Sequence, residues 1–351
     1  MGLIADLQRL RPTWRVTVDG QDVSALFKER RARIELFDAT GVKSDRLSID
    51  LVDGGRPYIE KPAPGAEVKL WLGYWPRLVY MGQFVTASFE TGGAPDAVRI
   101  DATAAPIAES SSGQRSMTEQ RSRSWPKGTR FGDLVARVAS DHGLRAAVGS
   151  ALGAVALPHV DQIDESDMNL LSRLGLDLDA VIKWGDGAIV VVERGAAVTA
   201  GGQPMPVVSV QPSSVARWRY SSDMRPAAER VVASSWDEDA AEPLEVAWDR
   251  TPDAEADPAS AAAGAVHRIK GRWPDRPSAL RAARAESRRK ARAEERLEIE
   301  CVGDPEAVAG AQLRASGFRP YVDRDWTIQS VRHLLDDGGY RMSLVAEPPS
   351  S

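Results

Sequence analysis

Cysteine and long apolar runs are almost absent from this sequence. Cys301 is the single cysteine in 351 residues, which excludes an intramolecular disulfide framework and a cysteine-rich metal site. The most apolar run, residues 188–192, has only the length of a strand, whereas a membrane-spanning helix needs roughly 18 residues. The N-terminus has no basic region followed by an apolar core and predicts no signal peptide. We therefore expect a protein made in the cytoplasm, with no membrane partner.

An excess of basic residues is also lacking. The chain carries 45 lysines and arginines against 50 aspartates and glutamates, which gives a formal net charge of −5. Nucleic-acid-binding proteins show a basic footprint instead, so we expect no sequence-specific nucleic-acid partner. The length suggests about two domains, at roughly 150 residues per domain.

Histidine is scarce, and the motifs of the common enzyme classes are missing. None of the four histidines forms an HxH or HxxxH pair, and without cysteine partners a zinc site is not expected. There is no GxSxG elbow, no GxxxxGKS/T loop and no GxGxxG after a strand. The sequence thus assigns no catalytic, cofactor-binding or metal residue, although a triad or a carboxylate pair assembled in space stays open. The histidines are His142, His159, His267 and His333.

Strand patterns dominate the first hundred residues. Residues 14–18, 45–51 and 67–73 alternate apolar and polar side chains with the period of two that a half-buried strand requires. Glycines separate these runs at spacings typical of antiparallel sheets. We expect a β-barrel or β-sandwich here.

The middle of the chain changes to helical patterns. Thr129 is a candidate N-cap for a helix through residues 133–139, and Gly143 would end that helix. A second helix is expected to open within residues 162–167, because apolar side chains follow at helical spacing as far as Leu178.

Four acidic residues gather at the expected start of the second helix. They lack the central glycine and the distal glutamate of an EF-hand calcium loop. Acidic side chains near a helix N-terminus are favoured by capping and by the helix dipole. We therefore interpret the cluster as helix-start chemistry and not as a metal site. Its members are Asp161, Asp164, Glu165 and Asp167.

The last third of the chain returns to strand patterns, with two charged segments between them. Residues 236–263 contain nine acidic residues against a single arginine. This segment has little apolar material for a core, so we predict a mobile acidic loop. Ser278 is predicted to cap a basic helix over residues 278–296.

The basic helix allows two interpretations. Its seven basic residues, against three acidic ones, could contact nucleic acid or an acidic partner. Alternatively, it is a solvated helix whose charges pair with the acidic loop before it, and we favour this second interpretation. The basic residues are Arg281, Arg284, Arg288, Arg289, Lys290, Arg292 and Arg296.

Three stretches carry a family resemblance when they are taken together and in order. The first is the strand at 14–18 with the segments 41–49 and 64–73, and the second is the helix pattern over 162–174. The third comprises short matches between residues 309 and 340. This ordered set, which spans nearly the whole chain, resembles the phage late control D family of contractile-tail baseplate hubs. The acidic segment 236–263 matches no pattern of that family.

The resemblance implies a mainly β fold with α-helical segments (α+β). Two tube-like antiparallel β-barrel domains, residues 10–105 and 206–351, would be joined by a helical linker region with short strands, residues 106–205. The acidic loop and the basic helix would interrupt the second barrel. The family relationship also links the chain to the N-terminal part of type VI secretion spike proteins. No spike-like repeat follows here, so we expect the spike to be a separate polypeptide.

The function implied by the resemblance is structural and not enzymatic. Such hubs form homotrimers that fit the sixfold tail tube to the threefold central spike and line the channel. The implied partners are the trimeric tail spike protein, the tail tube protein, the tape measure protein and baseplate wedge components. The implied location is the tail baseplate of the virion, assembled in the cytoplasm of the bacterial host. The resemblance does not identify the oligomer or spike interface residues.

Two other function classes stay open at this point. A tail-associated cell-wall hydrolase would need an acid pair or a metal set within one cleft. A carbohydrate-binding β-sandwich module is suggested by the ten tryptophans. Five of these lie in or beside expected strands, where core packing is the better interpretation. They are Trp14, Trp71, Trp184, Trp218 and Trp326.

Overall fold

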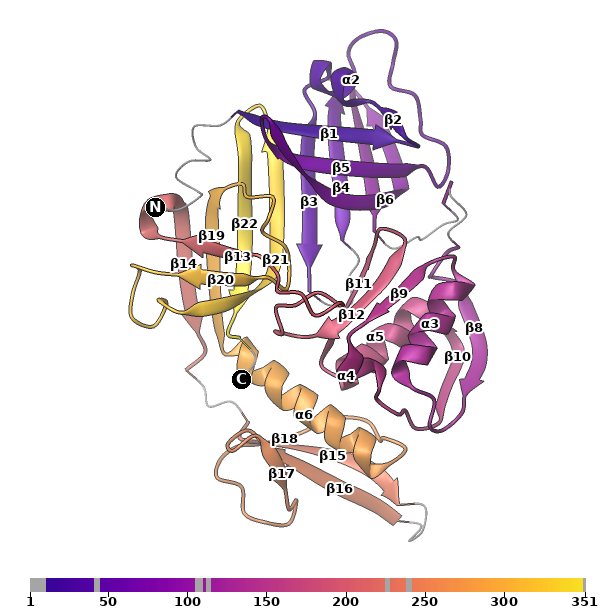
Figure 1. The fold of residues 1–351 in the computed structure, drawn as a ribbon, viewed down its shortest axis with the longest axis vertical. Helices are drawn as coiled ribbons and strands as arrows, with labels where there is room; N and C mark the ends of the chain where they lie inside the picture. Colours follow the sequence, from indigo (N-terminus) through magenta and orange to yellow (C-terminus); the bar gives the residue numbers. More distant parts are fainter. Residues whose placement is uncertain are drawn as a thin grey trace.

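The computed structural model describes residues 11–40, 45–104, 110–111, 115–224, 228–237 and 242–349. Its largest element is a 13-stranded sheet that draws strands from both ends of the chain (Figure 1). Eleven of these strands follow one path, in the order β14-β19-β22-β21-β3-β4-β7-β6-β5-β1-β2, and β13 and β20 lie beside it. The chain is mainly β, as the sequence predicts.

The first β block shows the period of two that its sequence predicts. In β4, for example, Leu47, Ile49 and Leu51 are buried, whereas the residues between them are only partly covered. The long strand β6 pairs with β5 through its first half and with β7 through its second half, so the sheet folds over its own core (Figure 1). The elements are β1 (Pro12–Val18), β2 (Gln21–Asp22), α2 (Ser24–Glu29), β3 (Arg33–Ala39), β4 (Arg46–Val52), β5 (Glu67–Tyr74), β6 (Arg77–Gly92) and β7 (Ala97–Thr103).

The last β block has its own core around the fully buried Trp326. Its strand β21 pairs antiparallel with β3 of the first block, from Ser330 opposite Ala39 to Leu335 opposite Ile34. The elements are β13 (Val207–Val210), η1 (Pro212–Ser214), β14 (Val215–Ser222), β19 (Glu295–Val302), β20 (Gln312–Ala315), β21 (Asp325–Asp336) and β22 (Gly339–Glu347).

The pairing of β21 with β3 bears on the expectation of two barrels. Among the described strands, neither block closes into a separate ring; the two blocks form one continuous sheet instead. The two closed tubes are therefore not confirmed, and the boundaries at residues 105 and 205 stay predictions.

The middle region packs against the first block, and the two share one hydrophobic core. The expected helix around residues 133–139 is present as α3, with Arg130 instead of Thr129 as its N-cap. Gly143 follows that helix with a φ of 68°, a conformation that favours glycine. The elements are β8 (Gln120–Trp125), α3 (Phe131–Asp141), β9 (Arg145–Val148), α4 (Ser150–Gly153), β10 (Val160–Ser166), α5 (Asp167–Asp177), β11 (Ala180–Gly185) and β12 (Ala188–Glu193).

The acidic segment 236–263 is not a loop over most of its described part, which corrects our prediction; residues 238–241 lie outside the described residues. Much of it belongs to a four-stranded sheet in the order β17-β16-β15-β18. The prediction failed because the apolar partners come from outside the segment: Val231 and the helix alanines Ala279 and Ala283 form a small core with Val246. The strands are β15 (Arg230–Asp237), β16 (Glu242–Asp249), β17 (Ala254–Ala256) and β18 (Val266–Arg268).

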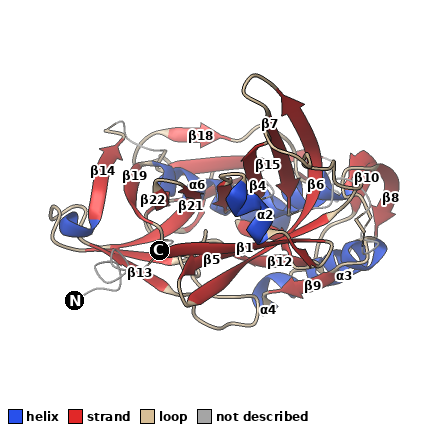
Figure 2. Ribbon diagram, turned by 90° about the horizontal axis from the view of Figure 1, so that it is seen from above, coloured by secondary structure: helices blue, strands red, loops and turns tan. Residues whose placement is uncertain are grey.

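The basic helix is α6 (Arg276–Ala293), and it packs on β15 and β16 (Figures 1 and 2). It begins earlier than predicted because Asp275, and not Ser278, is the N-cap; the Asp275 carboxylate accepts a hydrogen bond of 2.9 Å from the Ser278 amide. It also ends earlier, because the chain enters β19 at Glu295.

We call β15–β18 and α6 together the α6 module. Within the described residues, none of the helices is long and apolar enough to cross a membrane.

Candidate functional site

The four histidines do not come together. His142 and His333 are fully buried in different parts of the fold, whereas His159 is exposed and His267 is partly exposed. In the part of the chain that the structure describes, no group of three or more histidine, cysteine, aspartate or glutamate side chains could hold a metal ion.

His142 takes part in a buried polar cluster around Asp167, the first residue of α5. The Asp167 carboxylate contacts His142 Nε2 at 2.7 Å and accepts a hydrogen bond of 2.8 Å from Gln162. Arg123, on β8, also donates to it. Burial by itself would raise the pKa of Asp167, but the hydrogen bonds from His142 and Gln162 and the charge of Arg123 lower it. The cluster fixes the β8–β10 ribbon to the helices.

The interpretation of the four acidic residues as helix-start chemistry is correct only in part. Asp167 lies in the first turn of α5, which is capped by Ser166. The other three, Asp161, Asp164 and Glu165, belong to strand β10. The sequence pattern failed here because a β-bulge between Gln162 and Glu165 breaks the alternation that marks a strand.

A second charged cluster lies where the three parts of the chain meet. Lys183 on β11 donates to one carboxylate oxygen of Asp38 on β3, and the Ala309 amide of the last block donates to the other at 2.8 Å. Asp45 lies 3.8 Å from the Lys183 ammonium. Burial, and then the neighbouring charge of Asp38, raise the pKa of Asp45 to about 8. This cluster was missed, although a charged residue within an apolar strand, as Lys183 is, was a usable signal.

A third buried cluster involves His333 and Tyr340 of the last block. His333 Nε2 lies 3.0 Å from the carbonyl oxygen of Ala307, so this nitrogen donates and Nδ1 accepts from the Tyr340 hydroxyl at 2.9 Å. Burial lowers the pKa of His333 to about 4, which keeps the ring neutral. The Tyr74 hydroxyl, from the first block, donates to the Gly303 carbonyl nearby at 2.8 Å.

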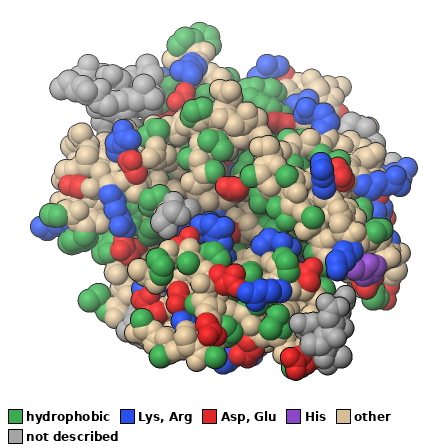
Figure 3. Space-filling view, turned by 60° about the horizontal axis from the view of Figure 1, so that its bottom comes forward, with side chains coloured by type: hydrophobic (Ala, Val, Ile, Leu, Met, Phe, Trp, Pro, Cys, Tyr) green, Lys and Arg blue, Asp and Glu red, His purple; other side chains and the backbone are tan. Residues whose placement is uncertain are grey.

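The interpretation that the charges of α6 pair with the acidic segment is correct only in part, because other basic residues of the predicted helix pair with Glu286, Asp179 or Glu298 instead. Arg288 contacts Asp253 of the acidic segment at 2.9 Å, and Arg284 approaches the same carboxylate at 3.9 Å. Near the end of the helix, the buried Arg292 makes a bidentate contact with Asp179 at 2.9 and 2.5 Å. Figure 3 shows the result on the lower face, where basic and acidic side chains are interspersed.

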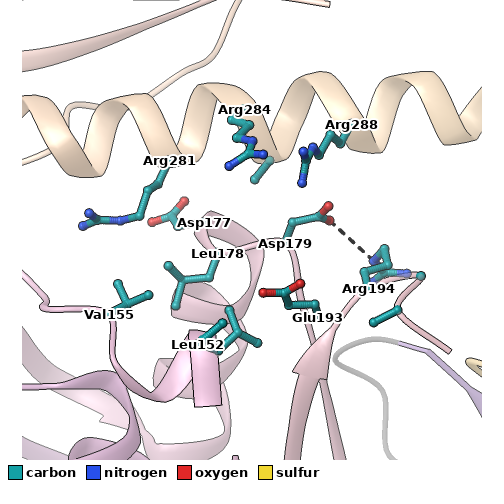
Figure 4. A pocket seen from close by; sticks show the side chains of 14 residues that line it. Leu152, Val155, Asp177, Leu178, Asp179, Glu193, Arg194, Arg281, Arg284 and Arg288 are labelled. Carbon is teal, nitrogen blue, oxygen red and sulfur yellow. Dashed lines mark ion pairs between the residues drawn. The ribbon is translucent and has the colours of Figure 1, made fainter. Parts of the chain in front are cut away.

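A cleft of about 390 Å³ separates α6 from the middle region (Figure 4). The arginines Arg281, Arg284 and Arg288 line it from the helix, and apolar and acidic side chains line it from α4, α5 and the end of β12. The cleft offers both charged and apolar surface, which are the two features that a binding site uses. The basic helix thus contributes to the surface as well as to internal ion pairs.

The tryptophans largely follow the core interpretation. Trp14, Trp184 and Trp326 are buried, and Trp71 and Trp218 are partly buried. Trp75, which the sequence did not single out, is 71% exposed, whereas the other exposed tryptophan among the described residues, Trp236, is 39% exposed. It lies in the turn between β5 and β6.

Known proteins resemble this chain in sequence and in fold. Baseplate hub proteins described as probable, from Escherichia phage 186 and Escherichia phage P2, are each 26% identical to it over 96% of this chain and 93% of theirs.

Solved structures share the fold over almost the whole chain. The 43 kDa tail protein of prophage MuSo2 from Shewanella oneidensis matches with a TM-score of 0.68 and 12% identity, over 97% of this chain and 99% of that one. A tail protein from Neisseria meningitidis matches with a TM-score of 0.69 and 12% identity, over 96% of both chains. The Escherichia coli c3393 protein, a type VI secretion component, matches with a TM-score of 0.56 and 11% identity, over 96% of this chain and 77% of that one.

The family relationship rests on a match over most of the chain. The family model described as phage tail baseplate hub (GPD) matches residues 115–339. This range includes the middle region, the α6 module and most of the last β block. The chain therefore belongs to the phage tail baseplate hub (GPD) family.

Proposed function

We propose that this protein is the structural hub of a contractile phage tail or phage-like particle and that it works as a homotrimer. Three copies would supply six β blocks, two from each chain. They would thereby fit a sixfold tail tube to a threefold central spike and enclose the channel for DNA or effectors. As partners we propose the trimeric tail spike protein, the tail tube protein, the tape measure protein and baseplate wedge components.

One observation carries the proposal beyond the family itself. The two β blocks are joined edge to edge by β21 and β3, through pairs that run from Ser330–Ala39 to Leu335–Ile34. Such a join extends both blocks into one continuous surface. Closed cyclic assemblies repeat contacts between different surfaces of neighbouring copies. A chain that already presents two blocks in series therefore supports a ring of six blocks made from three chains.

The proposed role is structural and not catalytic. Three carboxylates that the fold covers are held by cations: Asp167 by Arg123, Asp38 by Lys183 and Asp179 by Arg292. These ion pairs connect separate elements, and each carboxylate is occupied by its cationic partner. Incubation of the purified chain with peptidoglycan tests this point, and release of soluble fragments would support a cell-wall hydrolase instead.

The mass of the purified protein in solution tests the hub role directly. Light scattering would be measured on the protein alone and after mixing with the spike protein of the same particle. A trimer, or a monomer that becomes a complex of three chains with three spike chains, is the expected result. A protein that stays monomeric and does not bind the spike protein would contradict the proposal.

A further inference from the structure

One face of α6 presents a row of arginines to the cleft beneath the helix. Arg281, Arg284 and Arg288 are spaced three and four residues apart, so they follow each other along a single helix face. All three line the cleft, and Figure 4 shows them along the helix above it. The row spans two helical turns, or about 10 Å at a rise of 1.5 Å per residue.

The row is not fully neutralised by the rest of the protein. Arg281, which is half-buried, makes no hydrogen bond or close ion pair among the described residues, although Asp275 and Asp177 attract it at longer range. Arg284 and Arg288 share one carboxylate, that of Asp253. The Arg288 Nε is buried and has no hydrogen-bond partner within the described part of the chain. Buried polar atoms in native proteins are normally satisfied, so this donor indicates a missing partner.

The opposite wall of the cleft is apolar at its base. Leu152, Val155 and Leu178 line it from the middle region (Figure 4). Glu193 adds a carboxylate at the wall; its side chain is exposed and makes no ion pair among the described residues. Asp177 and Asp179 also line the cleft, but both carboxylates are engaged from the α6 side: Asp177 accepts a hydrogen bond of 3.1 Å from Trp273 Nε1, and Asp179 binds Arg292. The cleft is therefore preformed.

We propose that this cleft binds an extended polypeptide segment of a partner protein in which carboxylate side chains alternate with apolar ones. Arginine binds carboxylates through paired hydrogen bonds, and the row offers such donors at Arg281 and Arg288. Because alternate side chains of an extended chain point to opposite sides, the apolar ones reach Leu152 and Val155 while the carboxylates face α6. The volume of about 390 Å³ lies in the range of binding sites.

A phosphate polymer fits this cleft less well. The apolar base formed by Leu152, Val155 and Leu178 offers nothing to a sugar-phosphate backbone, which carries no apolar side chains to cover it. The hub role requires no such site, so this inference goes beyond the proposed function, and either can fail alone.

Fluorescence anisotropy on the full-length protein tests the proposal. The probe is a fluorescein-labelled hexapeptide of alternating aspartate and leucine; the comparison probes are the same peptide with lysine for aspartate and a ten-nucleotide oligothymidylate. We expect the aspartate–leucine peptide to bind at least tenfold more tightly than either comparison probe. Arg281→Ala should weaken its binding at least fivefold.

Two further variants make the result specific to the cleft. Arg137→Ala removes an exposed arginine of helix α3, outside the cleft, and should leave the affinity unchanged. Glu193→Gln removes the repelling carboxylate and should tighten binding at least twofold. Both changed residues are exposed, so the variants are expected to fold. Equal affinity of the wild-type and Arg281→Ala proteins, tighter binding of the oligothymidylate, or no saturable peptide binding would each overturn the proposal.

Discussion

Lys183 and Asp38 form an ion pair between the middle region and the first β block, although they lie far apart in the chain. The same Asp38 carboxylate accepts a hydrogen bond from the Ala309 amide, so this one side chain contacts all three parts of the protein. Asp38 therefore connects the two β blocks and the middle region at one point. A baseplate component must keep its parts aligned under load, and a buried charge pair provides that alignment only while both partners are present.

Replacement of Asp38 should be far more damaging than replacement of its neighbour Asp45. Asp38→Asn removes the charge opposite Lys183 and turns an amide NH₂ toward one of two existing donors, so we expect a loss of about 2–4 kcal/mol in the free energy of unfolding. Asp45→Asn should cause no loss, because the folded protein holds this carboxyl largely protonated at pH 7 whereas the unfolded chain ionises it, so the neutral amide removes a cost. Urea unfolding at pH 7 measures both. Equal losses would contradict the central role of Asp38.

The sequence predicted the elements much better than their connections. Period-two patterns located β4 and β5, and helical spacing located α5, because these signals depend on neighbours in the chain. The pairing of β3 with β21 joins residues about three hundred positions apart, and no local pattern encodes it. The acidic segment was misjudged for the same reason, since its core partners Ala279 and Ala283 lie on a later helix.

The candidate sites could be predicted only in part. The basic composition of α6 was visible in the sequence. Which of its arginines form internal ion pairs and which line the cleft depends on Asp253 and Asp179, and other elements position these two residues. The Asp38 cluster left a weaker signal: one lysine in the apolar strand β11 and one aspartate in β3. Two isolated charges in buried strands indicate a pair, but the sequence does not show that they are partners.

Asp45 should impose a pH dependence of its own on stability. Its pKa is about 8 in the folded protein and 3.8 in the unfolded reference, so the folded state binds more protons between these values. Stability from this group is therefore fully present below pH 4 and is lost as the pH rises toward 8. The difference in unfolding free energy between Asp45→Asn and the wild type should consequently increase, in favour of the variant, from pH 5 to pH 8. A difference that does not change with pH would rule out this titration.

His333 should act in the opposite direction. Burial lowers its pKa from 6.5 to about 4, so the unfolded state binds more protons between these values. Its contribution is fully present above pH 6.5 and is lost as the pH falls toward 4, by up to about 3 kcal/mol. His333→Gln can still donate to Ala307 and accept from Tyr340, but it cannot titrate. In urea unfolding from pH 7 to pH 4, the variant should lose less stability than the wild type, and parallel curves would contradict the assignment.

Gly303 should tolerate no side chain. A Cβ atom there would overlap the Tyr340 ring, which is itself buried and hydrogen-bonded to His333. Gly303→Ala must therefore displace a packed aromatic ring, and we expect a loss of about 2–3 kcal/mol. Gly54→Ala is the matched control, because a Cβ at that exposed glycine meets no atom within 4 Å. The midpoints of thermal unfolding compare the two, and a Gly303→Ala protein as stable as the control would show that the ring can move.

Arg292 should be the arginine of α6 on which the attachment of the α6 module most depends. It is 4% exposed, binds Asp179 through two hydrogen bonds and lies 3.6 Å from Glu347 at the end of β22. Arg292→Lys keeps the charge but loses the paired geometry, and we expect a cost of about 2 kcal/mol, with Arg292→Ala costing about 3–5 kcal/mol.

Arg296→Ala supplies the comparison for this prediction. Its ion pair with Glu298 is solvent-exposed, so its loss should cost no more than about 0.5 kcal/mol. Hydrogen exchange followed by mass spectrometry locates the effect, since loosening should appear in α6 and in the 177–180 turn while the β3–β21 pairing stays protected. If exchange rises uniformly over the chain instead, Arg292 stabilises the whole fold and is not a specific attachment of the α6 module.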